Sequence, residues 1–171
     1  MSAFGSRLLR LRSLVVGAVE DLRRPAAAPD LSGRVLLLAL ALMVGFGLFN
    51  QLAVPLRASY SARVTADEPF YLLTTVSLLE DGDLDLRNDY ELGRYWRFWD
   101  HEDDLWYQSV PTADGRILSP HNVGTSVLIA PAFALGRLDG AKGFLAVLGG
   151  VTIGLAFLLA FRASGELWSS L

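Results

Sequence analysis

The sequence contains no cysteine, which excludes disulfide bonds. Charge is also scarce, because only 19% of the residues are Asp, Glu, Lys or Arg, whereas a soluble domain carries about 25%. A P-loop, a GxGxxG fingerprint and a CxxC pair are all missing, so the sequence gives no sign of the sites that these motifs form. The largest polar region is acidic, which argues against nucleic-acid binding.

Three stretches contain no charged residue at all: 35–56, 117–136 and 143–161, with 22, 20 and 19 residues. A helix needs about 20 predominantly apolar residues to cross a bilayer. The second stretch is the most polar, since Pro120, His121 and Asn122 lie near its start and Pro131 lies inside it. Its start therefore has the composition of a re-entrant or interfacial segment. We predict three transmembrane helices, at 35–56, 119–136 and 143–161.

The basic residues near these segments predict how the chain is oriented. Residues 1–34 hold six Arg against three acids, whereas residues 57–116 hold six Arg against thirteen acids. Positively charged ends of membrane helices stay in the cytoplasm. The N-terminus and the short turn 137–142 are therefore expected in the cytoplasm, and the loop 57–118 is expected on the extracytoplasmic side. This arrangement describes a multi-pass protein of the cell (inner or plasma) membrane.

The N-terminal leader, residues 1–34, precedes the first apolar stretch. Apolar residues recur at three- and four-residue spacing over 4–24, which predicts an Arg-rich amphipathic helix on the cytoplasmic membrane surface. Arg10 and Arg12 interrupt the apolar run that a secretory signal would need. A disordered basic leader is the alternative.

The loop 57–118 has elements of its own. Acidic residues, Pro69 and Gly82 predict a juxtamembrane helix over 67–81, which starts either at a capping box of Thr65 and Glu68 or with Pro69 in the first helical position. A turn and a short extended segment are expected after it. Asp114 and Gly115, between β-prone residues, predict a β-hairpin. The fold class is thus an all-α integral membrane protein with a short external hairpin.

Two further patterns bear on packing and on metal binding. Gly150 and Gly154 have the spacing that lets two membrane helices pack closely. His101 and His121 are the only histidines and lie far apart in the sequence, so their spacing does not indicate a metal site. Whether a divalent metal takes part is left open.

The order of these motifs resembles the N-terminal part of the GT-C-type membrane glycosyltransferases, which include protein O-mannosyltransferases and lipid A aminoarabinose transferases. The likeness covers residues 35–165: one span, Asp-Glu-Pro-x-Tyr at 67–71, the acidic DGDLDLRNDY, and SPHNVGTSVLIAPAFALG at the second span. Asn122 and Val123 stand where two prolines are common in the family.

The resemblance implies transfer of a sugar from a polyprenyl-phosphate donor, held in the membrane lipid, to an extracytoplasmic acceptor. Asp67 would be the catalytic base, and Glu68, Tyr71 and His121 would contact substrate. A purely structural helix cap is the other interpretation of Asp67.

The family has eleven or more spans, so we expect the chain to be an N-terminal portion that is inactive alone, with residues 162–171 leading toward a missing span. The alternative is a small non-enzymatic membrane subunit whose acidic loop binds a partner or cations.

Overall fold

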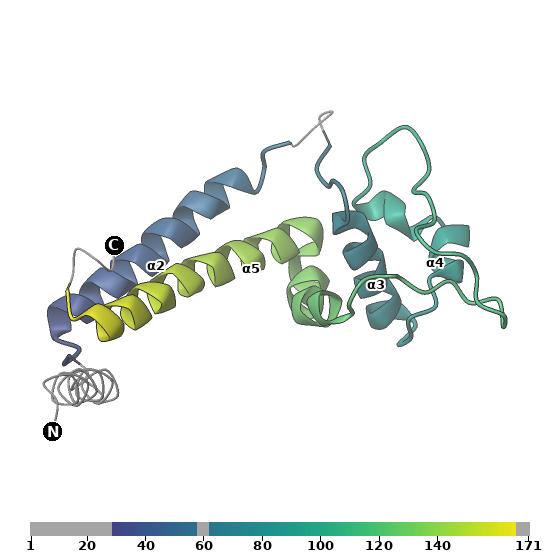
Figure 1. Ribbon diagram of the computed structural model, residues 1–171. Coiled ribbons are helices and arrows are strands. Elements are labelled where there is room, and N and C mark those ends of the chain that lie inside the picture. The colour runs from purple at the N-terminus through teal and green to yellow at the C-terminus, as the bar shows by residue number, and fades with distance from the viewer. Residues whose placement is uncertain (1–28, 58–61, 167–171) are drawn as a thin grey trace, which may run out of the picture. The chain divides into compact units, whose positions relative to one another are not determined.

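A computed structural model describes residues 29–57 and 62–166. Its elements are α2 (Gly33–Ala53), α3 (Glu68–Glu80), α4 (Arg87–Glu91), the 3₁₀ helix η2 (Arg94–Arg97) and α5 (Gly124–Ser164) (Figure 1). The amphipathic leader helix predicted over 4–24 and residues 167–171 lie outside the described residues. The described chain falls into two units. The smaller unit contains the first residues of α2 and the last residues of α5, and the larger unit is Leu38–Leu155.

Helix α2 corresponds to the first predicted span. The Ser32 hydroxyl accepts a hydrogen bond from the N–H of Val35 at 3.5 Å, in the manner of an N-cap. The 21 residues of α2 are long and apolar enough to cross a membrane. Large apolar side chains on the helix are mostly exposed, among them Leu37 at 67% and Leu52 at 76%. Water does not favour such a surface, whereas lipid does.

Helix α5 corrects the prediction of three spans, because the described residues contain two candidate membrane-spanning helices. Arg137 has φ 53° and ψ −140°, which breaks α5 into residues 124–136 and 138–164. The first part has 13 residues and is about 20 Å long, too short for a bilayer core of about 30 Å. The predicted span 119–136 is therefore wrong, and the apolar stretch 143–161 lies in the second part.

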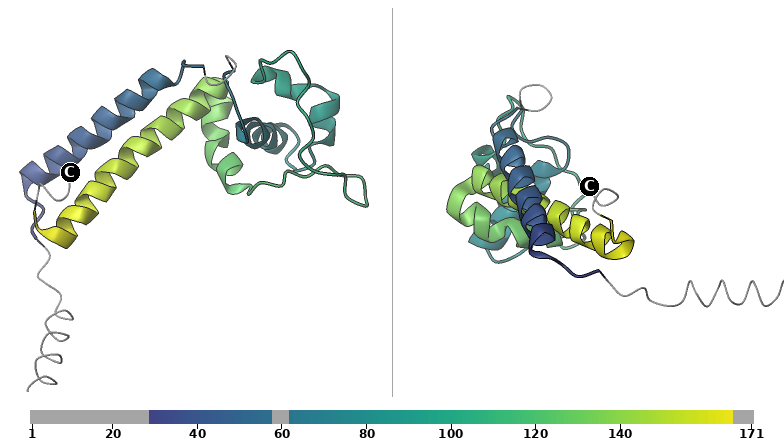
Figure 2. Two further views of the ribbon diagram at one scale, coloured as in Figure 1. Left: turned by 45° about the horizontal axis from the view of Figure 1, so that its top comes forward. Right: turned by 90° about the vertical axis from the view of Figure 1, so that its left-hand side faces the viewer.

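Residues 138–155 of α5 run antiparallel to residues 38–53 of α2 (Figure 2). Gln51 donates a hydrogen bond to the carbonyl of Gly143 at 2.7 Å, and Gly150 lies against Gly47 and Met43. A Cβ on Gly150 would clash with the carbonyl oxygen of Met43 and lie 2.9 Å from the backbone nitrogen of Gly47. The close helix packing that the spacing of Gly150 and Gly154 predicts is thus present in the structure.

Residues 137–142 do not connect two spans. Arg63 pairs with Asp139, and the Lys142 ammonium donates to the carbonyl of Arg63. Lys142 also lies 3.8 Å from Glu68. These contacts place 137–142 beside the segment that precedes α3. The structure thus brings the turn 137–142 into contact with residues of the loop 57–118, two segments that the charge pattern places on opposite sides of a membrane.

The larger unit has an aromatic-rich core built on α3. Phe70, Leu73 and Val76 of α3 are buried, and Phe133 from the first part of α5 packs against Phe98 with ring centroids 6.4 Å apart. The Ser126 hydroxyl donates to the carbonyl of Tyr71 at 2.9 Å. Helix α3, which lies within the predicted range 67–81, is therefore enclosed by protein on most sides.

The predicted β-hairpin is wrong, since the structure contains no strand in the residues it describes. Only its turn forms, with the N–H of Thr112 bonded to the carbonyl of Arg116 at 2.9 Å. The arms bond elsewhere: the Ile117 N–H donates to the Asp85 carboxylate at 2.9 Å, and the Ile117 carbonyl accepts from Leu86 at 2.8 Å. The extended segment expected after α3 is partly helical, because α4 covers Arg87–Glu91.

Candidate functional site

The start of α3 has an unusual backbone. Ala66 has φ 50°, in the left-handed region that costs an alanine energy. Asp67 follows as the N-cap residue, yet its side chain makes no capping hydrogen bond. Strained residues concentrate at functional sites, where the surrounding structure holds them in place. The Asp67 carboxylate is 59% exposed, and because it bonds to no N–H of the first helical turn it does not cap α3.

The Asp67 carboxylate instead faces Gln108 and His121. The Gln108 amide donates to Oδ1 of Asp67 at 3.4 Å, and the Gln108 carbonyl oxygen contacts Nε2 of His121. Because a carbonyl oxygen only accepts, Nε2 of His121 carries the proton in this arrangement. His121 Nε2 is itself 3.7 Å from Asp67. The three side chains form a polar cluster that is open to water.

Tyr71 completes this cluster on its apolar side. Its ring centroid is 4.9 Å from that of His121, and Phe70 is 6.1 Å from the same ring. The structure thus brings together Asp67, Tyr71 and His121, three of the four residues proposed from the sequence. Gln108 was missed, because a single glutamine in a loop carries no sequence signal.

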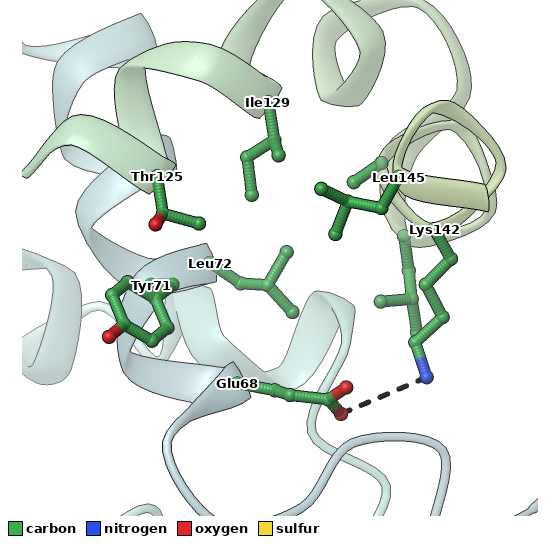
Figure 3. A pocket seen from close by; sticks show the side chains of 9 residues that line it. Glu68, Tyr71, Leu72, Thr125, Ile129, Lys142 and Leu145 are labelled. Carbon is green, nitrogen blue, oxygen red and sulfur yellow. Dashed lines mark ion pairs between the residues drawn. The ribbon is translucent and has the colours of Figure 1, made fainter. Parts of the chain in front are cut away.

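Glu68 belongs to a different set of contacts. Its carboxylate accepts from the N–H of Thr65 at 3.1 Å, as in one half of a capping box, and lies 3.8 Å from the Lys142 ammonium. Figure 3 shows this ion pair beside Leu72, Ile129 and Leu145, which line a small cavity between α3 and both parts of α5. The volume of the cavity is about 70 Å³.

A second, larger hollow also reaches Glu68 and Lys142. Its volume is about 350 Å³, and it extends along α2 and α5 past Phe46, Asn50 and Gly149. One end of the hollow is thus charged, and the remainder is mostly apolar. Lys142 is the only lysine in the sequence. Its position immediately before an uncharged stretch is the signal that sequence reasoning missed.

Three acidic residues at the end of α3 and in α4 have arginine partners. Arg94 pairs with Asp81 and with Asp89, the latter at 2.8 Å, and Arg97 pairs with Glu80. The hydrogen bond from Arg97 holds the pKa of Glu80 below its ordinary value, and that from Arg94 does the same for Asp81. Burial raises the pKa of Asp89, whose side chain is fully inaccessible. These acids hold the fold together.

Within the described ranges, no group of three or more His, Asp or Glu side chains is placed to hold a metal ion. Asp67 and His121 form a pair without a third ligand of this kind.

No protein-family model matches the chain, and neither a curated protein nor a solved structure matches it. Residues 29–57 and 62–166 contain two helices long and apolar enough to cross a membrane, and a helical polar region that carries the Asp67 cluster.

Proposed function

We propose that this chain is the N-terminal portion of a membrane glycosyltransferase that moves a sugar from a polyprenyl-phosphate donor to an acceptor outside the cytoplasm. The observation that carries the proposal is the Asp67 carboxylate, which is free of helix capping and faces Gln108 and His121. The resemblance of residues 67–71 to the GT-C-type transferases supports the assignment.

In the proposed reaction, Asp67 takes the proton of the acceptor hydroxyl as the acceptor oxygen bonds to the sugar's anomeric carbon. The bond from that carbon to the phosphate oxygen breaks, and the polyprenyl phosphate leaves. A general base must lie within hydrogen-bond reach of the proton it accepts. The open position of Asp67 leaves room for such an acceptor, and the Gln108 amide orients the carboxylate.

The hollow beside Lys142 supports a lipid-linked donor. An ammonium binds phosphate as a point charge, and the hollow continues from Lys142 along apolar residues of α2 and α5. A phosphate at Lys142 would leave its hydrocarbon chain beside the two apolar helices.

The alternative, a non-enzymatic subunit whose acidic loop binds a partner or cations, has less support at the first acids of the loop. Glu80, Asp81 and Asp89 are paired with Arg94 and Arg97, which reduces the charge that these three acids offer to a cation or a basic partner.

Substitutions at Asp67 test the catalytic role in the complete enzyme. Asp67→Asn keeps the size of the side chain but accepts no proton, so turnover of a polyprenyl-phosphate sugar should fall by about 10²-fold or more. Because the side chain makes no cap bond, both Asp67→Asn and Asp67→Ala should melt close to the wild type. A structural cap predicts instead that Asn is active and that Ala loses about 1 kcal/mol. A fully active Asp67→Asn enzyme would end the catalytic proposal.

Topology is a second test, and the absence of cysteine makes single-cysteine labelling unambiguous. With the N-terminus in the cytoplasm, Val110→Cys and Gly136→Cys should both react with an impermeant maleimide added outside. The reason is that both positions belong to the polar region around α3, which the proposal places outside the membrane. Val110 is 84% exposed, and a Cβ at Gly136 has nothing within 4 Å. Labelling of Gly136→Cys only after membrane permeabilisation would restore the three-span arrangement and contradict the external site.

A further inference from the structure

A cavity separate from the Lys142 hollow opens beside the start of α3. Its volume is about 520 Å³, and it lies between residues 65–66 and the loop that runs from Trp99 to Trp106. Small-molecule sites have volumes of about 300–1,000 Å³. Ala66, which lines this cavity, is the strained residue immediately before Asp67.

Aromatic rings form the walls of the cavity. Trp99 is buried and stacks on His101, with centroids 3.9 Å apart, and it meets Trp106 edge-on at 5.7 Å. Trp106 is 54% exposed, which is unusual for a tryptophan that has an apolar core beside it. The cavity is thus lined by two tryptophans, of which Trp106 is the more exposed.

Two carboxylates, Asp103 and Asp104, line the same cavity. The Trp99 indole N–H donates to the main-chain oxygen of Asp103 at 2.7 Å, and the Tyr95 hydroxyl donates to Asp104 at 2.7 Å. These bonds fix the loop and leave carboxylate oxygens to accept further bonds. Among the residues that the structure describes, no lysine or arginine lines the cavity, and Arg63 is paired with Asp139.

We propose that this cavity binds a small organic cation through its ammonium group. A cation is attracted to the face of a tryptophan ring, and more strongly where water is excluded. Adjacent carboxylates add a direct charge partner, which an uncharged ligand of the same shape would not exploit. Both an amino sugar and the choline or ethanolamine headgroup of a lipid carry such a group.

The test uses the purified chain in dodecyl maltoside, a detergent without charge or amine. Tetramethylammonium is titrated against tert-butanol, its uncharged counterpart in size, and saturation-transfer NMR reports binding. Tetramethylammonium should bind saturably and at least about 10-fold more tightly than tert-butanol. Equal binding of the two would overturn the proposal.

Three variants locate the site. Trp106→Ala and Asp103→Asn should each weaken tetramethylammonium binding by about 3- to 10-fold, within the range of a cation–π contact. Trp96→Ala is the matched control, because Trp96 is 47% exposed and does not line the cavity. Far-ultraviolet circular dichroism checks folding, and Asp103→Asn keeps the test valid if Trp106→Ala unfolds. Unchanged binding in Asp103→Asn and in folded Trp106→Ala would also overturn the proposal.

Competition then assigns the source of the cation. Stronger displacement of tetramethylammonium by glycerophosphocholine identifies a lipid headgroup, and stronger displacement by glucosamine identifies an amino sugar, with glucose as its uncharged control. Equal displacement by glucose and glucosamine would contradict recognition of the ammonium. Because binding is measured without turnover, the result is independent of the glycosyltransferase proposal.

Discussion

The apolar helix pair and the polar region around α3 are held together by different means. Between α2 and α5, glycines bring the backbones together, as Gly150 does against Met43 and Gly47. Large apolar side chains on the same helices point outward and are exposed. Lipid solvates such side chains as well as protein does, so close van der Waals packing has to hold the pair.

The polar region depends on buried side chains instead. An aromatic-rich core surrounds α3, and Arg94 joins three acids, one of which is fully buried. Water drives the burial of the apolar side chains, and the ion pairs offset the cost of enclosing charge. The Asp67 carboxylate differs from these acids, because it makes no capping hydrogen bond and contacts Gln108 and His121 in place of an arginine.

Loss of Arg94 should produce the largest effect on stability. Arg94→Met leaves Asp89 buried without its charge partner, which costs about 3–5 kcal/mol when one member of a buried pair is removed. Urea unfolding, followed by tryptophan fluorescence, measures the change. Arg116→Met is the control, because its pair with Asp114 is exposed on both sides and should contribute nothing measurable. Equal losses in the two variants would show that the Arg94 pairs are not what stabilises the polar region.

Two adjacent glycines, Gly149 and Gly150, test whether the helix pair is stabilised by close backbone contact or only by its high content of glycine. Gly150→Ala places a Cβ against backbone atoms of Met43 and Gly47, and such overpacking costs about 1–3 kcal/mol. Gly149→Ala meets only the Asn50 amide at 3.6 Å and the Phe46 ring at 3.9 Å, which are ordinary contacts. Alanine should be neutral or slightly stabilising there, because it favours helix. Thermal unfolding in detergent compares the two, and similar melting temperatures would contradict the packing argument.

The sequence predicted the largely helical class, and its apolar stretches 35–56 and 143–161 overlap the two candidate membrane-spanning helices, because charge-free length is a local property. It also placed a turn at 137–142, and the structure breaks α5 at Arg137 but resumes the helix at residue 138. The error at 119–136 was to count as a span a segment whose helical part has only 13 residues. Pro131 and His121 already pointed to a weaker segment, but only its packing on α3 shows where the segment goes.

The candidate site was predicted in part. The motif at 67–71 provided Asp67 and Tyr71, and the likeness at 119–136 added His121. Their meeting depends on the loop around Gln108, whose arms bond to the segment after α3 in place of each other. Alternating β-prone residues cannot reveal this, because side-chain acceptors such as Asp85 compete with a strand partner. Lys142 likewise becomes a candidate site residue only once the structure shows its contact with Glu68.

The smallest expected effect is a difference in how the two regions respond to acid. Glu80 and Asp81 have pKa values below their ordinary 4.5 and 3.8, because Arg97 and Arg94 bond to the charged forms. Their contribution to stability is present above those values and is lost as pH falls through the lowered ones. Burial raises the pKa of Asp89, so its contribution has the opposite sign: it is present below 3.8 and is lost as pH rises through the raised value.

These opposing terms should leave the wild type with a shallow acid dependence, measured as the urea midpoint from neutral pH to below 3.8. Asp89→Asn keeps a hydrogen-bond acceptor for Arg94 but removes the opposing titration, so its stability should fall more steeply with acid than that of the wild type. Asp81→Asn removes a titration of the other sign and should flatten the profile. The helix pair has no titratable residue within 38–53 or 143–155, so melting of the contact probed by Gly150 should not follow pH. Parallel acid profiles for Asp89→Asn and the wild type would show that Asp89 titrates as it does in the unfolded chain. The free energy of unfolding would then give no support to the contrast between the buried Asp89 carboxylate and the exposed Asp67 carboxylate.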